Sequence, residues 1–223
     1  MSDLAIYDLD RTVTRIGTYT PFLIHSAMRR APWRLLLLPV TAASMLAYAA
    51  KIIDRGELKE TNHWLLLGGS IHPKDLKPLV DSFADATVAR NIRPGARKAI
   101  ARDKKEGRRL VLATASYRLY ADAIAERLGF DDVIGTASVI GLDERLRSRI
   151  LGENAYGEAK LRMIKTWVAK SGLKGKHGHV RFDSDHASDA PTFEWADEPV
   201  AVNPHAALAR LAKTRGWPIE DWG

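Results

Sequence analysis

The sequence predicts an α/β protein in which a parallel sheet core carries an all-helical insert. Three observations predict this fold class. The apolar run over 4–7 is typical of a short buried strand, and polar residues follow it at once. Residues 17–86 show helical patterns only, whereas strands and helices alternate from Pro94 onward. With 223 residues, the chain is long enough for one core and a small inserted cap.

The insert is predicted to be a helical cap over 17–86. Its helices are expected over these ranges: 21–30, from 32 onward, 58–67 and 73–87, with a glycine-containing turn at 68–70. Residues 35–50 contain no charged side chain and are interrupted by Pro39. The run falls short of the roughly 20 residues that cross a bilayer as a straight helix, so no transmembrane span is predicted. Such a helix must bury most of its circumference, either in a cap or at a membrane interface.

The two flanking segments, 1–16 and 87–223, are predicted to form the core. After the first strand, its elements are expected in the following order: a helix at 94–106, a strand at 109–113, a helix at 117–128, a strand at 132–135, a β-hairpin at 136–150, a helix at 156–170, a strand at 178–182, a helix at 190–196, a strand at 199–202 and a helical tail at 203–223. Gly107 and Gly129 mark the ends of two of these helices.

Two carboxylates follow the first predicted strand. Asp8 and Asp10 stand at positions i and i+2 where the strand gives way to a loop. Both can turn toward the carboxyl edge of the sheet, where open α/β sheets bind ligands. Like charges this close repel, so the pair is favourable if a cation shares it or if one carboxyl keeps a proton. The pair offers a nucleophile beside a general acid, although an isolated pair also fits an acidic turn.

Hydroxyl and amino groups follow at later positions. Thr114 and Ser116 come at the end of the strand at 109–113, where a hydroxyl and free backbone N–H groups suit a phosphate oxygen. Lys160 lies in the first turns of the helix at 156–170. A positive charge gains nothing from the helix dipole there, so its placement favours a functional role.

A second acidic group follows the strand at 178–182. It contains Asp183, Asp185 and Asp189. Carboxylates clustered after a strand suit Mg²⁺, which takes hard oxygen ligands and keeps several waters. The sequence therefore predicts a magnesium site shared between this loop and the first strand.

The order of these motifs resembles the haloacid dehalogenase superfamily of phosphohydrolases, in its phosphoserine-phosphatase-like branch, subfamily IB. The resemblance covers the whole chain and rests on four motifs: Asp8-Leu9-Asp10-Arg11-Thr12, Thr114, Lys160, and Asp185 with Asp189. In this family the core is a Rossmann-like parallel sheet, and the cap lies between motifs one and two. Arg11 stands where many relatives have glycine. Asp183 and Ser184 precede Asp185 where many relatives have a glycine directly before the metal ligand, which leaves Asp183 as the reserve ligand.

The resemblance implies a Mg²⁺-dependent phosphatase that acts through an aspartyl-phosphate. Asp8 would attack phosphorus, and Asp10 would protonate the leaving oxygen and then activate water. Phosphate contacts are implied for three residues: Thr114, Ser116 and Lys160. The metal would be held by Asp8, the backbone carbonyl of Asp10, and Asp185. Asp189 would orient Lys160 or a metal-bound water.

The net charge of +7 predicts an anionic partner. Nine basic residues lie between Arg90 and Arg109, against Asp103 and Glu106. The stretch is either a solvated helix face or a surface that attracts anionic lipid, a phosphate-bearing substrate or nucleic acid. No nucleic-acid-binding motif is present, so nucleic acid is not expected. The oligomeric state is not indicated.

The absence of cysteine excludes disulfides and thiolate metal sites and fits a reducing compartment. The first residues show no basic segment followed by an apolar one, so a signal peptide is not expected. A cytoplasmic enzyme is predicted, with a peripheral position at the inner face of the membrane as the further option.

Two substrate classes remain open at the sequence level. The uncharged run at 35–50, with arginines around it, resembles the cap of bacterial phosphatidylglycerophosphate phosphatases and favours a membrane-presented lipid phosphate. The same run is equally consistent with the buried centre of a cap, which favours a small soluble phosphomonoester such as phosphoserine. A membrane-surface binding module with a vestigial site is a third reading. The intact Asp8, Asp10, Lys160 and Asp185 argue against it.

Overall fold

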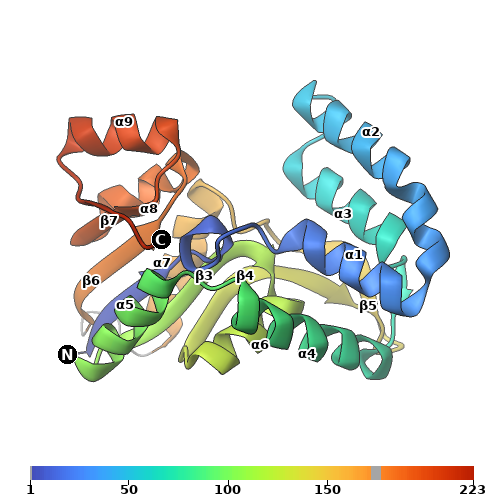
Figure 1. The fold of residues 1–223 in the computed structure, drawn as a ribbon, viewed down its shortest axis with the longest axis horizontal. Coiled ribbons are helices and arrows are strands. Elements are labelled where there is room, and N and C mark those ends of the chain that lie inside the picture. The colour runs from blue at the N-terminus through green and yellow to red at the C-terminus, as the bar shows by residue number, and fades with distance from the viewer. Residues whose placement is uncertain (1, 172–176) are drawn as a thin grey trace.

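The computed structural model describes residues 2–171 and 177–223, which form an eight-stranded sheet flanked by helices (Figure 1). The strand order is β2-β5-β4-β3-β1-β6-β7-β8. The strands are β1 (Ser2–Tyr7), β2 (Ser70–Ile71), β3 (Arg109–Tyr117), β4 (Asp132–Ile140), β5 (Leu146–Leu151), β6 (His177–Ser184), β7 (Glu198–Val202) and β8 (Ile219–Glu220). β1 pairs in parallel with β3 on one side and β6 on the other, so the predicted parallel core is confirmed.

Alternate side chains of the central strands enter two separate cores. On β1, Leu4 and Ile6 join one hydrophobic cluster, and Ala5 and Tyr7 join the other. This period of two explains why every residue of the run is apolar, because a strand covered on both faces needs apolar groups on both. Asp8 is the first residue after β1, so its side chain emerges at the carboxyl edge of the sheet.

Helices cover both faces of the sheet. α4 (Pro73–Arg90), α5 (Pro94–Lys105) and α6 (Arg118–Leu128) contribute buried residues to the cluster around Tyr7. α7 (Glu158–Lys170), α8 (Ala190–Trp195) and α9 (Ala206–Arg215) contribute to the cluster around Ile6. Short turns η1 (Leu9–Val13) and η3 (Ala187–Asp189) follow β1 and β6 at the edge where the predicted site lies.

The predicted insert contains α1 (Tyr19–Arg30), η2 (Pro32–Leu37), α2 (Leu38–Ala49) and α3 (Arg55–Leu66), stacked beyond the carboxyl edge of the sheet (Figure 1). Pro39 lies in the first turn of α2, so the uncharged run is split between η2 and α2. The insert also carries β2, which pairs antiparallel with β5. α4 runs beside α6 and continues through residue 86. The boundaries at 17 and 86 stay a prediction.

β4 differs from the expected strand and separate hairpin. It is one strand over Asp132–Ile140, and its first half pairs in parallel with β3 while its second half pairs antiparallel with β5. The hairpin turn at 141–145 is where Gly141 predicted it. The expected break at Gly135 does not occur, because the residues that follow it pair with β5. Gly135 itself lies against Arg118 and the Ser116 carbonyl, where a Cβ would be tightly packed.

The basic stretch from Arg90 to Arg109 lies on and around α5, toward the opposite end of the molecule from α2 (Figure 1). Several of its arginines have partners inside the fold. Arg97 donates to the Val88 carbonyl, Arg102 pairs with Asp103, and Arg109 pairs with Asp132. No helix in the described part of the chain is long and apolar enough to span a membrane.

Candidate active site

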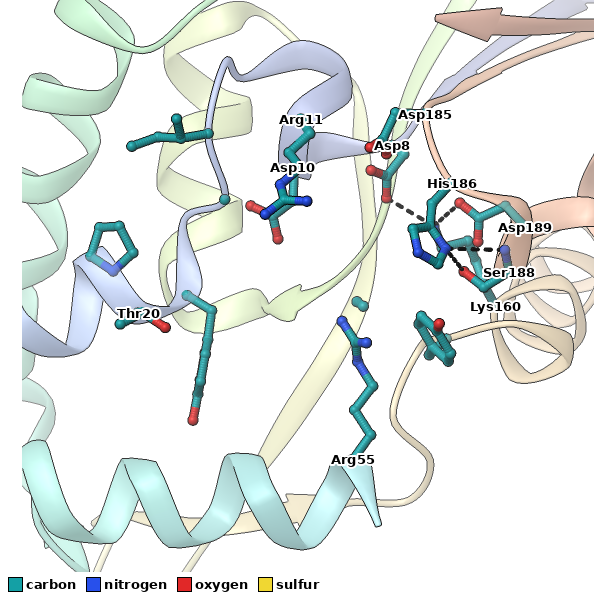
Figure 2. Close-up of a pocket in the computed structure, with 16 residues that line it drawn as sticks. Asp8, Asp10, Arg11, Thr20, Arg55, Lys160, Asp185, His186, Ser188 and Asp189 are labelled. Carbon is teal, nitrogen blue, oxygen red and sulfur yellow. Dashed lines mark hydrogen bonds and ion pairs between the residues drawn. The ribbon is translucent and has the colours of Figure 1, made fainter. Parts of the chain in front are cut away.

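Asp8 lies at the base of a cavity between the core and the helical insert (Figure 2). Its backbone N–H donates to the Asp183 carbonyl at 2.9 Å, so the pairing of β1 with β6 fixes its position. The residue is only 7% exposed. Burial raises the pKa of Asp8 to about 8 although Lys160 opposes the shift, and the nearby carboxylates of Asp189 and Asp185 add to it. A cation beside it would favour the ionised form that a nucleophile needs.

Lys160 joins two of the predicted motifs. Its Nζ donates to Asp8 Oδ1 at 2.8 Å and to Asp189 Oδ2 at 2.7 Å, and the residue is 2% exposed. Burial opposes the charged form, but the Asp189 and Asp8 carboxylates prevail and raise the pKa of Lys160 above its ordinary value. Ser184 Oγ also donates to Asp189 Oδ2, at 2.7 Å. Lys160 therefore remains a fixed cation between Asp8 and Asp189.

The hydroxyl of Thr12 lies between the carboxylates of Asp185 and Asp8. Thr12 Oγ1 lies 3.3 Å from Asp185 Oδ1 and 3.4 Å from Asp8 Oδ2. Burial raises the pKa of Asp185 to about 6, although Lys160 opposes the shift. One carboxylate from motif one and one from motif four therefore face the same small volume, and their mutual repulsion favours a cation between them.

The donor set at this position fits Mg²⁺. Within residues 2–171 and 177–223, no three side chains of His, Cys, Asp or Glu gather into a metal cluster. Mg²⁺ does not need such a cage, because it is usually bound through one or two carboxylates and keeps several waters. Asp8 and Asp185 supply the two carboxylates. Asp189 Oδ1 is buried and has no hydrogen-bond partner in the described part of the chain, so it is an acceptor available to a metal-bound water.

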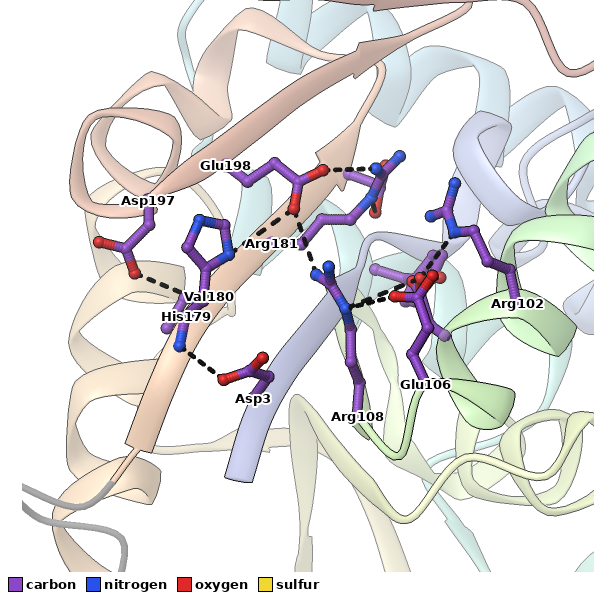
Figure 3. Close-up of polar contacts among 12 residues, drawn as sticks. Asp3, Arg102, Glu106, Arg108, His179, Val180, Arg181, Asp197 and Glu198 are labelled. Atoms are coloured by element: carbon purple, nitrogen blue, oxygen red, sulfur yellow. Dashed lines mark hydrogen bonds and ion pairs between the residues drawn. The ribbon is translucent and has the colours of Figure 1, made fainter. Parts of the chain in front are cut away.

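Asp183, the reserve ligand, has a different partner. Arg181 Nε lies 3.0 Å from Asp183 Oδ2, and a terminal guanidinium nitrogen lies 2.9 Å from Oδ1. The same guanidinium contacts Glu198 at 2.8 Å, in a polar cluster that also includes Arg108 (Figure 3). Asp183 is fully buried and does not line the cavity. The geometry therefore favours Asp185 over Asp183 as the metal ligand.

Asp10 is oriented by three hydrogen bonds. The backbone N–H of Thr18 donates to Asp10 Oδ1 at 2.6 Å, and the Thr18 hydroxyl donates to the same oxygen at 2.7 Å. Ser116 Oγ donates to Oδ2 at 2.6 Å and accepts from Tyr120 OH at 2.8 Å. The side chain predicted as a phosphate contact, Ser116, thus holds the predicted general acid in this structure.

Thr114 lies on β3 behind the cavity wall. It is fully buried, and its Oγ1 accepts the backbone N–H of Ser116 at 3.0 Å. Ala115, between the two predicted residues, lines the cavity. The phosphate contacts of Thr114 and Ser116 stay predictions, and the structure places the β3 backbone between them beside the site.

Two adjoining cavities meet at Asp10 and Arg55. The larger, of about 570 Å³, is lined by Asp8, Lys160 and Asp185 and by residues of the α1 entrance. The smaller, of about 240 Å³, extends between α2 and α3 and is lined by Met45, Tyr48 and Lys59 among others. A leaving group attached to a phosphoryl group at Asp8 can therefore extend under the helical insert.

Arg55 and Lys59 were missed by the sequence reasoning. Both lie on α3, and Arg55 projects into the larger cavity (Figure 2). Its guanidinium lies over the Tyr156 ring. The sequence does contain a pattern that could indicate these residues. Asp54 and Glu57 have the spacing of a capping box, which marks the start of α3. Arg55 and Lys59 are then basic residues in the first turns of a helix, the same unfavourable placement that singled out Lys160.

A profile of the haloacid dehalogenase-like hydrolase family matches residues 5–194 of the chain. A histidinol-phosphatase from Neisseria meningitidis is 28% identical over 61% of this chain and 62% of its own length. Phosphoserine phosphatase SerB1 from Mycobacterium tuberculosis is 30% identical over 66% of this chain and 47% of its own length. The chain thus spans less than two thirds of the length of either curated relative.

Among solved structures, a protein of unknown function from Bordetella pertussis superimposes with a TM-score of 0.89. It is 24% identical to this chain, and the alignment covers 100% of both chains. The likeness shows that the whole fold, including the helical insert, occurs in a bacterial protein.

Proposed function

This chain belongs to the haloacid dehalogenase-like hydrolase family, and we propose that it is a Mg²⁺-dependent phosphatase that hydrolyses phosphomonoesters through an aspartyl-phosphate. The proposal rests on the position of the Lys160 ammonium group. Its Nζ lies 2.8 Å from Asp8 Oδ1 and 2.7 Å from Asp189 Oδ2, so residues of three motifs meet in one site. The curated relatives named as phosphatases support the same class of reaction.

Asp8 would act as the nucleophile. Its carboxylate would form a bond to phosphorus while the bond to the leaving oxygen breaks, and Lys160 would bind a phosphoryl oxygen in place of part of its present contact. Asp8 and Asp185 would hold Mg²⁺ with the Asp10 carbonyl, and the bound ion would neutralise charge on the transferring group.

Asp10 would act as the general acid and then the general base. Thr18 and Ser116 hold both of its oxygens, so the carboxyl is presented in one orientation beside the leaving group. After the leaving group departs as the protonated alcohol, Asp10 would remove a proton from the water that attacks the aspartyl-phosphate. Free Asp8 and inorganic phosphate result.

A phosphate-release screen tests the proposal. Purified protein is incubated with Mg²⁺ and a panel of small phosphomonoesters, and with lipid phosphates in detergent. We expect release that EDTA removes and Mg²⁺ restores. No release from any member of the panel, with Mg²⁺ present and the protein folded, would contradict the proposed reaction.

We further propose that the substrate is presented at a membrane surface, because the proposed cap (17–86) carries an exposed apolar face. Leu36 is 80% exposed and Leu46 is 72% exposed, and Trp33, Val40 and Ile52 of the same segment are also exposed. Burying a leucine side chain is worth about 1.5–3 kcal/mol. The other face of α2 contributes Met45 and Tyr48 to the smaller cavity, so α2 lies between that cavity and the outside. Leu37, in contrast, is partly buried and packs against the core.

Liposome sedimentation at low salt tests the membrane proposal. We expect the protein to bind anionic vesicles more than neutral ones, since each basic residue near anionic lipid adds about 1 kcal/mol. Replacing Leu36 and Leu46 by Asp should abolish binding and activity on lipid phosphates but spare a small substrate. Leu142→Asp, at a fully exposed position of the β4–β5 turn, is the matched control and should change nothing.

Absence of vesicle binding, together with efficient turnover of a small phosphomonoester such as phosphoserine, would favour the alternative. In that case the enzyme is a soluble small-molecule phosphatase and the α2 face has another role.

Replacing Lys98 and Lys105 by Gln should leave vesicle binding unchanged, because α5 lies away from α2 (Figure 1).

A further inference from the structure

Tyr120 lies behind the residue proposed as the general acid. It belongs to α6 and is fully buried, and its hydroxyl donates to Ser116 Oγ at 2.8 Å. Ser116 Oγ donates in turn to Asp10 Oδ2 at 2.6 Å. Tyr120 is not among the residues that line the two adjoining cavities. It can therefore reach the reaction only through the hydroxyl of Ser116.

The hydroxyl of Ser116 has a single proton and more than one acceptor within reach. A serine hydroxyl rotates to suit its neighbours, and Ser116 Oγ lies 3.1 Å from Thr18 Oγ1 as well as close to Asp10. The proton that Tyr120 donates occupies one lone pair of Ser116 Oγ and excludes that direction. It also polarises the serine hydroxyl, because hydrogen bonds in a chain strengthen one another. Both effects favour donation from Ser116 to Asp10.

The Tyr120 hydroxyl is a permanent donor in a fixed place. Burial, and then the charge of Asp10, raise the pKa of Tyr120 above its ordinary value, so the phenol keeps its proton. Its ring stacks on Phe22 with the ring centres 4.6 Å apart, and it packs edge-on against Phe83 at 5.7 Å. The packed ring holds the hydroxyl beside Ser116.

Thr18 gives an independent indication that the surroundings of Asp10 serve to orient it. Thr18 is the N-cap residue of α1, a position where a threonine hydroxyl usually accepts a backbone N–H of the first turn. Its hydroxyl instead donates to Asp10 Oδ1 at 2.7 Å, beside its backbone N–H at 2.6 Å. Phe22, which packs against Tyr120, lies one turn further along the same helix. The first turns of α1 and α6 thus meet around one carboxylate.

We propose that Tyr120 is a positioning residue for Asp10 and acts through the Ser116 hydroxyl. The inference rests on the proposed phosphatase function, in which Asp10 protonates the leaving oxygen as its bond to phosphorus breaks. The orientation of the carboxyl matters most when the leaving oxygen needs that proton. Loss of the Tyr120 hydroxyl should therefore slow substrates with basic leaving groups and spare substrates with good ones.

Single turnover of two aryl phosphates tests this role. Phenol leaves phenyl phosphate with the help of an acid, whereas nitrophenol leaves p-nitrophenyl phosphate without it. With protein and Mg²⁺ in excess over substrate, Tyr120→Phe should release phenol about tenfold more slowly than wild type, as expected for one lost hydrogen bond. Its release of nitrophenol should be unchanged. Tyr117→Phe is the matched control and should keep both rates, because the buried Tyr117 hydroxyl has no hydrogen-bond partner within residues 2–171 and 177–223.

Double variants distinguish positioning from packing. If Tyr120 acts through Ser116 and Asp10, Tyr120→Phe should slow phenol release no further in a Ser116→Ala or an Asp10→Asn background. Equal slowing of the two substrates by Tyr120→Phe, or a further tenfold loss on top of Asp10→Asn, would overturn the positioning role. Failure of the wild-type protein to release either product would instead contradict the phosphatase function, and this inference with it.

Discussion

Asp183 and Asp185 are two residues apart, and their surroundings give them different roles. Asp185 shares the Thr12 hydroxyl with Asp8 and faces the cavity. Asp183 is fully buried and is neutralised by Arg181 through a fork of hydrogen bonds. The first arrangement suits a ligand that exchanges with solvent, and the second suits a fixed structural ion pair.

Matched amide substitutions should separate these roles. Asp185→Asn should raise the Mg²⁺ concentration needed for half-maximal phosphate release at least about tenfold, with little change in stability. Asp183→Asn should lower the free energy of unfolding by about 3 kcal/mol, because it leaves the buried Arg181 charge with less compensation. Mg²⁺ titration and urea unfolding measure the two effects. A reversed ranking in the Mg²⁺ titration would move the ligand to Asp183.

Lys59 should leave a signature in the pH dependence of stability. Its pKa is about 7 in the folded protein, whereas an unfolded lysine titrates near 10.4. Between these values the unfolded state binds more protons, so this residue makes the free energy of unfolding rise with pH. Below about pH 7 both states are protonated and the burial cost is complete.

Lys59→Met should therefore flatten the rise in unfolding free energy between about pH 7 and about pH 10. Urea unfolding of the ligand-free protein at several pH values measures it. Lys51→Met, at an exposed lysine after α2, should keep the wild-type slope. Equal slopes for wild type and Lys59→Met would show that Lys59 titrates normally.

At the scale of elements, α3 is the part of the proposed cap that reaches the site. The Asp54 side chain accepts the Glu57 N–H at 2.8 Å, and the Glu57 side chain accepts the Asp54 N–H at 2.8 Å. This capping box fixes the first turn, which carries Arg55. The Arg55 contact with Tyr156 and the Lys59 contacts with Ala115 and Asn154 then join α3 to the core.

Loss of the capping side chain of Asp54 should weaken the start of α3. Asp54→Ala should cost about 1 kcal/mol of stability, whereas Asp54→Ser, which can still accept the hydrogen bond, should cost much less. Because the first turn of α3 carries Arg55, which lines the larger cavity, Asp54→Ala should raise KM more than it lowers kcat. Steady-state kinetics on p-nitrophenyl phosphate measure this, and an unchanged KM would contradict the coupling.

At the scale of the whole molecule, the parallel core followed from local patterns. Apolar runs such as 4–7 and 109–113 lie in central strands that are buried on both faces, and the carboxyl ends of parallel strands must share one edge. This rule predicts that Asp8, Asp185 and the end of β3 lie close together although they are far apart in the sequence. Lys160 was found because its charge is badly placed for a helix N-terminus.

Other features depended on tertiary contacts that no local pattern encodes. β4 continues past Gly135 because the second half of the strand finds a partner in β5. The hydrogen bonds that Ser116 makes with Asp10 and Tyr120 join residues from three separate segments of the chain. The sequence does not show whether the basic stretch and the uncharged run share one surface, and α5 and α2 lie toward opposite ends of the molecule (Figure 1).

The central claim is that Asp8 becomes phosphorylated and that Asp10 completes the reaction. The most direct measurement is the mass of the intact protein, and then of its N-terminal peptide, after rapid acid quenching with substrate and Mg²⁺. With p-nitrophenyl phosphate, whose leaving group departs without a general acid, Asp10→Asn should accumulate one phosphoryl group on Asp8, because hydrolysis of the intermediate needs the base at position 10. Asp8→Asn should show neither the adduct nor phosphate release. Wild-type turnover by Asp8→Asn, or a phosphoryl group on another residue, would contradict the account.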